Sequence, residues 1–218
     1  MKLASTTKLN KGFMLGSESY NYFYHDYNTT WGNERTVEIP IIQSLVQEHL
    51  HDRILELGNV LSHYFNINHK VVDKYEREPG VVNQDIVDFD TPERYNLIVS
   101  ISTIEHIGWD EKPRDSDKPF RALKRLRSLL DTGGEICYTV PIGSNPSIDK
   151  AIGDDSNRLA DSMRFLRRLN FANEWAECNR EEALKLSYGD FKYSHNGFPP
   201  YPHANAVMVG VIANSRCP

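Results

Sequence analysis

The sequence is poor in cysteine and has no long apolar run. Its three cysteines, Cys137, Cys178 and Cys217, are far apart and odd in number, which argues against a disulfide framework and against a zinc site with paired ligands. No apolar stretch approaches the length of a membrane span, and residues Met1–Lys11 lack the apolar segment of a signal peptide. We therefore expect a soluble protein of a reducing compartment, the cytoplasm, with no membrane partner.

Clusters of basic residues are also missing. The chain has 25 Lys and Arg residues against 30 Asp and Glu residues, a formal net charge of -5. Affinity for nucleic acid comes from neutralising its phosphates, so we expect no nucleic-acid partner. His49 and His51 suggest a metal-ligand pair, but residues two apart do not share a helix face. We expect no metal, and the oligomeric state stays open.

What the chain does contain is a series of short apolar runs that alternate with helical stretches. Strands are predicted at 53–58, 70–73, 81–86, 95–102 and 135–140, and helices at 37–51, 61–65 and 118–130. This alternation predicts βαβ units and a parallel sheet, an α/β Rossmann-like three-layer sandwich. Pro40 must then sit in the first turn of its helix. The turn at 131–134 should end the helix before it, with glycine near the C-cap.

The 218 residues suit one domain. We divide it into an aromatic-rich N-terminal extension (1–36), a core (37–141) and a C-terminal part (142–218). In the last part the pattern predicts a helix at 157–169 and strands at 175–180 and 204–213. The two strands should form an antiparallel pair at one edge of the sheet.

Ligands of an open parallel sheet bind at the carboxyl ends of its strands, so the residues that follow each strand are candidates for a site. The first strand ends in Glu56, Leu57, Gly58 and Asn59, where glycine lets the backbone approach a ligand. Asp73 ends the second strand and can accept hydrogen bonds from a ribose diol. The third strand is ended or followed by Asp85 and then Ile86, where an acid can bind the exocyclic amine of adenine and an apolar side chain can cover its ring.

The fourth strand ends in Ser100, Ile101 and Ser102, and Glu105 and His106 follow. This end of the strand is where a second substrate would be presented. His106 is a candidate general base, because the pKa of histidine lies near the working pH. Glu105 is a candidate for positioning the substrate. Alternatively, both residues only orient a loop.

Two polar stretches complete the candidate site. Residues 109–118 follow the fourth strand and suit a substrate-facing loop, in which Arg114 can hold a phosphate or carboxylate. Residues 189–202 are rich in glycine and proline, and His195 within them is a candidate substrate residue. Solvated loops are the alternative for both stretches.

Together these motifs resemble the class I S-adenosylmethionine-dependent methyltransferases. The likeness rests on the motif at 56–58, Asp73, Asp85, the strand and loop at 97–106, and the turn and strand at 130–140. It covers 37–141 well and 157–213 less specifically. The resemblance implies an enzyme with S-adenosyl-L-methionine as cofactor that methylates a small polar acceptor. We favour an oxygen of a sugar, nucleotide-sugar or phosphorylated metabolite, since the chain also resembles methyltransferases of surface-sugar and glycan modification.

One feature departs from that family. Its first loop usually carries several glycines, whereas Gly58 is the single glycine here. The missing Gly-x-Gly-x-x-Gly pattern counts against a nicotinamide-dependent oxidoreductase, in which this turn holds a pyrophosphate. That oxidoreductase is one alternative. A catalytically inactive, methyltransferase-like subunit that binds a partner is the other.

Overall fold

A twisted eight-stranded sheet forms the centre of the protein. The computed structural model describes residues 11–154, 159–186, 188–189 and 203–214. The strand order is β5-β4-β3-β6-β7-β10-β8-β9. The strands are β3 (Ile54–Leu57), β4 (Lys70–Val72), β5 (Val81–Val82), β6 (Tyr95–Ile101), β7 (Leu130–Pro141), β8 (Ser162–Arg168), β9 (Trp175–Cys178) and β10 (Ala206–Ala213).

The first five strands of this order run parallel to one another. Strand β10 is antiparallel to both β7 and β8, so β8 runs in the same direction as β7. Strand β9 is antiparallel to β8 and ends the sheet. The Rossmann-like, mostly parallel sheet with an antiparallel C-terminal strand is therefore confirmed. The predicted edge pair of 175–180 with 204–213 is wrong, because β10 lies inside the sheet and β8 separates it from β9.

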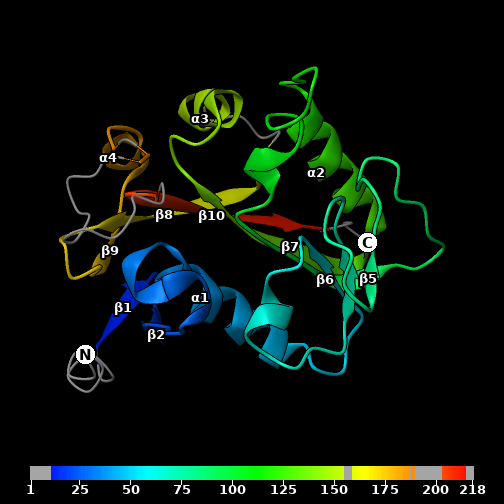
Figure 1. The fold of residues 1–218 in the computed structure, drawn as a ribbon, viewed down its shortest axis with the longest axis horizontal. Coiled ribbons are helices and arrows are strands. Elements are labelled where there is room, and N and C mark those ends of the chain that lie inside the picture. The colour runs from blue at the N-terminus through cyan, green and yellow to red at the C-terminus, as the bar shows by residue number, and fades with distance from the viewer. Residues whose placement is uncertain (1–10, 155–158, 187, 190–202, 215–218) are drawn as a thin grey trace.

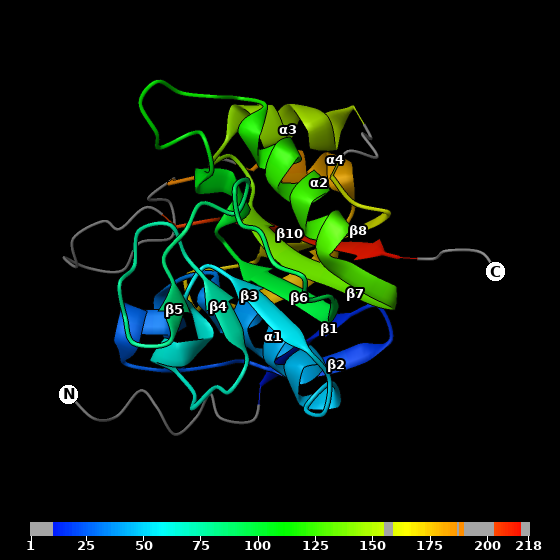
Figure 2. The same cartoon turned by 90° about the vertical axis from the view of Figure 1, so that its right-hand side faces the viewer.

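Helices cover both faces of the sheet (Figures 1 and 2). One face carries α1 (Arg35–Glu48) and the hairpin of β1 (Gly12–Leu15) and β2 (Glu18–Asn21). The other carries α2 (Lys118–Leu129), α3 (Pro146–Gly153) and α4 (Arg180–Leu184). Successive residues of a strand point to opposite faces. In β6, Leu97 and Val99 therefore join the core under α1, while Ile98 joins the core under α2.

Pro40 leaves a carbonyl group of the first helix free to bind the N-terminal extension. Helix α1 begins at Arg35, so Pro40 lies in its second turn and not in the first as predicted. Proline has no N–H, so the carbonyl oxygen of Thr36, four residues earlier, receives no bond from it. The backbone N–H of Phe23 donates to that oxygen at 3.0 Å. The extension thus occupies the hydrogen-bonding position that proline leaves open.

The aromatic residues of the extension pack against one another and onto the domain. The ring of Phe13 stacks on those of Tyr20 and Tyr22, with centroids 5.4 and 5.5 Å apart. The hydroxyl of Tyr22 accepts a bond of 2.7 Å from the backbone N–H of Trp175 in β9. Phe23 meets Tyr64 edge to face at 5.3 Å. A short 3₁₀ helix, Tyr27–Gly32, then leads into α1.

The C-terminal part contains the main error of sequence interpretation. The predicted helix at 157–169 is wrong, because 162–168 form β8. Phe165 and Leu166 are both buried, but on opposite faces of the sheet. In a short segment, adjacent apolar residues of this kind suit a helix as well as a strand. Helix α3 was not anticipated, although its N-cap is typical: the side chain of Asn145 accepts bonds from the N–H groups of Ser147 and Ile148, and Pro146 follows it.

The glycine turn expected to end α2 is a second correction. Leu130 already has an extended conformation and begins β7, so Gly133 and Gly134 lie within the strand and cap no helix. A Cβ at Gly134 would lie 2.7 Å from the carbonyl oxygen of Tyr95. Among the described residues, no helix is long and apolar enough to cross a membrane.

Candidate functional site

The order of strands in the sheet reverses at β3, which creates a switch point. From β3 the chain goes to β4 and β5 on one side, whereas β6 and β7 lie on the other. The carboxyl ends of β3 and β6 meet there, the place where open α/β sheets bind ligands. A pocket of about 70 Å³ opens at this point. Its walls come from the ends of β3, β4, β5 and β6, and include Leu57, Gly58, Asp73, Asp85, Ile86 and His106.

Gly58 brings the end of β3 close to the end of β6. Its φ of +85° lies in the left-handed region that favours glycine. A Cβ at this position would lie 2.2 Å from Oγ1 of Thr103, which also lines the pocket. The single glycine of the first loop is thus required by contact between two strand ends.

Glu56 shapes this loop from inside the protein and does not line the pocket. It is fully buried. Its Oε1 accepts hydrogen bonds from the backbone N–H groups of Val60 (2.9 Å) and Leu61 (2.8 Å). Its Oε2 lies 2.8 Å from Nε2 of His69. The loop that follows β3 is only a short 3₁₀ turn, Leu61–His63, and the Glu56 carboxylate binds its first N–H groups.

Asp73 connects the loops that follow β3 and β4. Its Oδ1 accepts bonds of 2.8 Å from the N–H groups of Tyr75 and Glu76, and its Oδ2 accepts one of 3.2 Å from the N–H of Asn59. The Asn59 side chain donates in turn to Glu76 at 2.9 Å. Three bonds leave part of the accepting capacity of the Asp73 carboxylate for a ligand.

Asp85 belongs to a group of four charges that was not predicted from the sequence. Lys118 Nζ, at the start of α2, lies 2.6 Å from Oδ2 of Asp85, and Lys74 Nζ lies 3.0 Å from it. Both lysines also bind Glu111, at 2.6 and 3.0 Å. Burial alone would raise the pKa of Asp85, but the two ammonium groups outweigh burial and lower it. The Lys74–Glu111 pair joins the loops after β4 and β6, and both residues line the pocket.

The polar end of β6 divides between structural and exposed roles. Ser100 and Ile101 are fully buried, and the hydroxyl of Ser100 donates to the carbonyl of Leu57 at 2.9 Å. Ser102 has a φ of +41°, an uncommon conformation for a residue with a side chain. Its hydroxyl donates to Oε1 of Glu38 in α1 at 2.6 Å. None of these three residues lines the pocket, unlike Thr103 and His106.

His106 and Glu105 lie side by side but in different surroundings. The His106 side chain is 56% exposed, with Nδ1 at 2.6 Å from Oδ2 of Asp110. Its Nε2 lies 3.5 Å from Oε1 of Glu105, whose side chain is only 2% exposed. Burial raises the pKa of Glu105 well above the ordinary value, and the nearby Glu38 acts in the same direction.

Glu105 is part of a buried acid cluster, which we define as Glu34, Glu38 and Glu105 with Arg35. Arg35 Nη1 binds Oε2 of Glu38 at 2.8 Å, and Glu34 Oε2 accepts a bond of 3.0 Å from the N–H of Ala204. The members of this cluster from the start of α1 were not predicted from the sequence. The only available signal was the spacing of Glu34 and Glu38, four residues apart on one helix face.

The two remaining candidates lie elsewhere. Arg114 stacks over the ring of Trp109, with its Cζ 4.1 Å from the centroid, and its Nε donates to the Trp109 carbonyl at 3.0 Å. It does not line the pocket. His195 lies outside the described residues. Within the described part of the chain, no group of three or more His, Cys, Asp or Glu residues could hold a metal ion.

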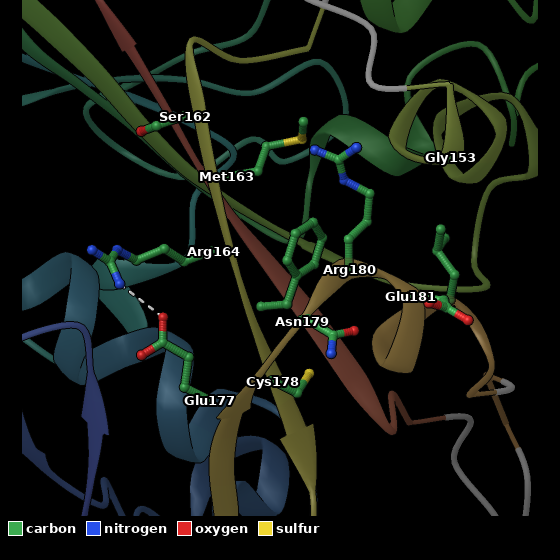
Figure 3. Close-up of a pocket in the computed structure, with 11 residues that line it drawn as sticks. Gly153, Ser162, Met163, Arg164, Glu177, Cys178, Asn179, Arg180 and Glu181 are labelled. Atoms are coloured by element: carbon green, nitrogen blue, oxygen red, sulfur yellow. Dashed lines mark hydrogen bonds and ion pairs between the residues drawn. The ribbon is translucent and has the colours of Figure 1, made fainter.

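A second, wider groove of about 740 Å³ lies against β8, β9 and α4 (Figure 3). Strands β7 and β10 separate it from the switch point. Arg164 and Glu177 at its rim form an ion pair of 2.8 Å with each other, drawn dashed in Figure 3. We take the smaller pocket as the candidate site, because it lies at the switch point, where open α/β sheets bind ligands.

Comparisons with known proteins give a likeness at the level of structure only. No protein-family model matches the chain, and no curated protein matches it. The N-methyltransferase NodS from Bradyrhizobium japonicum, solved with S-adenosyl-L-homocysteine, is 12% identical, covers 85% of this chain and 95% of its own, and has a TM-score of 0.41. The CcbJ methyltransferase from Streptomyces caelestis is 11% identical, with coverages of 80% and 88% and a TM-score of 0.40. A possible histamine N-methyltransferase from Thermotoga maritima is 13% identical, with coverages of 75% and 83% and a TM-score of 0.40. At these scores the likeness decides nothing about the activity of this chain.

Proposed function

We propose that the protein is an S-adenosylmethionine-dependent methyltransferase that acts on a small polar acceptor. One observation carries the proposal. Gly58, Asp73 and the Asp85–Ile86 pair follow three adjacent parallel strands and line one pocket at the switch point. This is the order of motifs on which the resemblance to class I methyltransferases rests. The proposal includes a cytoplasmic location. It also includes a small-molecule partner in place of nucleic acid, and the net charge of -5 supports this choice of partner.

The residues of the pocket fit the parts of this cofactor. Gly58 offers backbone without a Cβ, Asp73 has accepting capacity for a ribose diol, and Ile86 can cover a purine ring beside Asp85. The pocket of about 70 Å³ is too small for a nucleoside, and the side chain of Lys74, which lines it, is 35% exposed. Binding therefore requires side chains at the rim of the pocket to move, and the partly exposed Lys74 is one that can.

When bound, the cofactor supplies an electrophilic methyl group, so the protein has to orient the acceptor, exclude water and remove a proton. His106 suits the last task for a hydroxyl acceptor. Asp110 beside Nδ1 can hold the proton on that nitrogen, which leaves Nε2 to accept another. A sugar, nucleotide-sugar or phosphorylated metabolite is the acceptor that the sequence favours.

The oxidoreductase alternative has less support. A dinucleotide needs a glycine-rich turn that leads directly into a helix, whose N-terminus binds the pyrophosphate. After Gly58 the described chain forms only the 3₁₀ turn Leu61–His63 before β4. No regular helix therefore starts at the pocket in this loop.

Calorimetry with S-adenosylmethionine, S-adenosylhomocysteine, NAD and NADP tests the proposal. We expect micromolar binding of the first two ligands and none of the nicotinamides. Asp73→Ala should weaken binding at least about tenfold, or 1.4 kcal/mol. Asp90→Ala is the matched control, because the side chain of Asp90 is 94% exposed and outside the pocket. Preference for a nicotinamide would refute the proposal. Binding without turnover on any acceptor would favour an inactive subunit.

A further inference from the structure

The buried acid cluster holds more acidic groups than the described part of the protein pairs with cations. It combines three carboxyl groups with the guanidinium of Arg35, and Tyr188 adds a phenol whose pKa burial and these carboxylates raise. Arg35 bonds to Glu38 alone among the three acids. Buried charges are costly unless each is paired. An excess of acid in this place is therefore a feature that needs a physical reason.

Glu105 is the least satisfied member of the cluster. Its Oε2 is buried and has no hydrogen-bond partner among the described residues. Its Oε1 approaches His106 Nε2 only to 3.5 Å. Glu38, by contrast, has both oxygens engaged, by Arg35 and by the hydroxyl of Ser102. A buried polar atom without a partner is rare in native proteins and often marks a position that a ligand completes.

The cluster borders the pocket at the switch point. Of the residues that follow β6, some face the acid cluster and others line the pocket. Ser102 bonds to Glu38, and Glu105 interacts electrostatically with it. Thr103 and His106 line the pocket. His106 is adjacent to both, because it lines the pocket and its Nε2 faces Glu105. Among the residues that line the pocket, His106 is thus the one whose ring lies next to the Glu105 carboxyl group.

We propose that the methyl acceptor carries a protonated amine, which Glu105 holds beside the cofactor pocket with the help of Glu34 and Glu38. An ammonium group supplies the donor that Oε2 of Glu105 lacks, and its positive charge would hold the Glu105 carboxyl in its ionised form. A neutral hydroxyl supplies only the donor. The proposed acceptor is thus an amino sugar or another small hydroxylated amine. This inference rests on the proposed function, since it assigns the cluster to the acceptor of that reaction.

Matched ligand pairs test the inference. Calorimetry on protein loaded with S-adenosylhomocysteine compares glucosamine with glucose, and ethanolamine with ethylene glycol. We expect each amine to bind at least about tenfold more tightly than its neutral partner. Glu105→Gln keeps the shape of the side chain and should abolish that preference. Glu48→Gln, the same change at an exposed position near the end of α1, should leave it intact.

Each outcome decides the matter separately from the proposed function. If S-adenosylhomocysteine binds but the amines show no advantage in the wild-type protein, the acceptor is not an amine and the inference is overturned. The same holds if Glu105→Gln retains the advantage while its thermal unfolding shows it to be folded. If S-adenosylhomocysteine itself does not bind, the proposed function fails, and an amine preference in the ligand-free protein would then establish a cation site without methyl transfer.

Discussion

Replacing Gly58 by alanine tests the contact between the ends of β3 and β6. The new Cβ would lie 2.2 Å from Oγ1 of Thr103, 2.9 Å from its Cγ2 and 3.0 Å from its Cβ. Alanine at the φ of +85° costs about 1–2 kcal/mol of backbone strain. The overlap with a neighbouring side chain adds about 1–3 kcal/mol. We expect Gly58→Ala to lower the free energy of unfolding by about 2–5 kcal/mol, the sum of these two costs.

Gly80→Ala separates the two contributions. Gly80 has a φ of +87°, and nothing lies within 4 Å of the position where its Cβ would be. It should therefore show the backbone strain alone, about 1–2 kcal/mol. Thr103→Ala removes Oγ1 and Cγ2. In the double variant with Gly58→Ala it should therefore recover most of the stability that Gly58→Ala loses beyond Gly80→Ala. Urea unfolding followed by circular dichroism measures all four variants.

Two results would refute the reasoning. If Gly58→Ala is no more destabilising than Gly80→Ala, the two strand ends are not in contact. If the double variant shows no coupling, the contact does not involve the side chain of Thr103. S-adenosylhomocysteine affinity, measured in parallel, should fall with Gly58→Ala and stay unchanged with Gly80→Ala, since only Gly58 lines the pocket.

Three further predictions concern single charges. Burial raises the pKa of Glu105 above 4.5, so the folded state keeps a proton that the unfolded chain loses, and stability falls as pH rises through this range. Glu105→Gln removes that loss. In urea unfolding, the free energy of unfolding of the variant relative to wild type should rise by about 1–3 kcal/mol from pH 4 to pH 8. A variant-minus-wild-type difference that is equal at the two pH values would contradict the assignment. Glu56→Gln should cost about 2–3 kcal/mol, because an amide cannot accept from two N–H groups and His69 together; a loss below about 1 kcal/mol would show that the carboxylate does not hold the loop. Lys185→Ala breaks the pair with Glu181 and should leave the midpoint of urea unfolding unchanged, because the two side chains are 69% and 82% exposed.

The candidate pocket could be located from sequence to the extent that it depends on strand ends. Gly58, Asp73, Asp85 and His106 each lie at or after the end of a predicted strand, and parallel strands bring their carboxyl ends to one edge. The structure places all four around one pocket. Glu56 and Ser100 follow the same local pattern, but their side chains point into the protein and bond to backbone groups. A sequence does not distinguish these two directions when a strand is only a few residues long.

Long-range pairing explains the errors in the C-terminal part. Residues 162–168 became a strand because β10 and β9 bond to them on both sides. The apolar spacing of so short a segment suits a helix as well as a strand. Strand β10 itself was located correctly, but its place between β7 and β8 depends on partners that are distant in the chain.

Apolar periodicity over a few residues was enough to predict the α/β class, the parallel core strands and the acids and glycine at their ends. Which charges meet, by contrast, depends on the packing of elements that are distant in the chain. Lys74 and Lys118 reach Asp85 from two different loops, and Glu38 reaches Ser102 from a helix 64 positions earlier. Such contacts form when elements far apart in the chain pack onto one sheet, and no local pattern of residues records them.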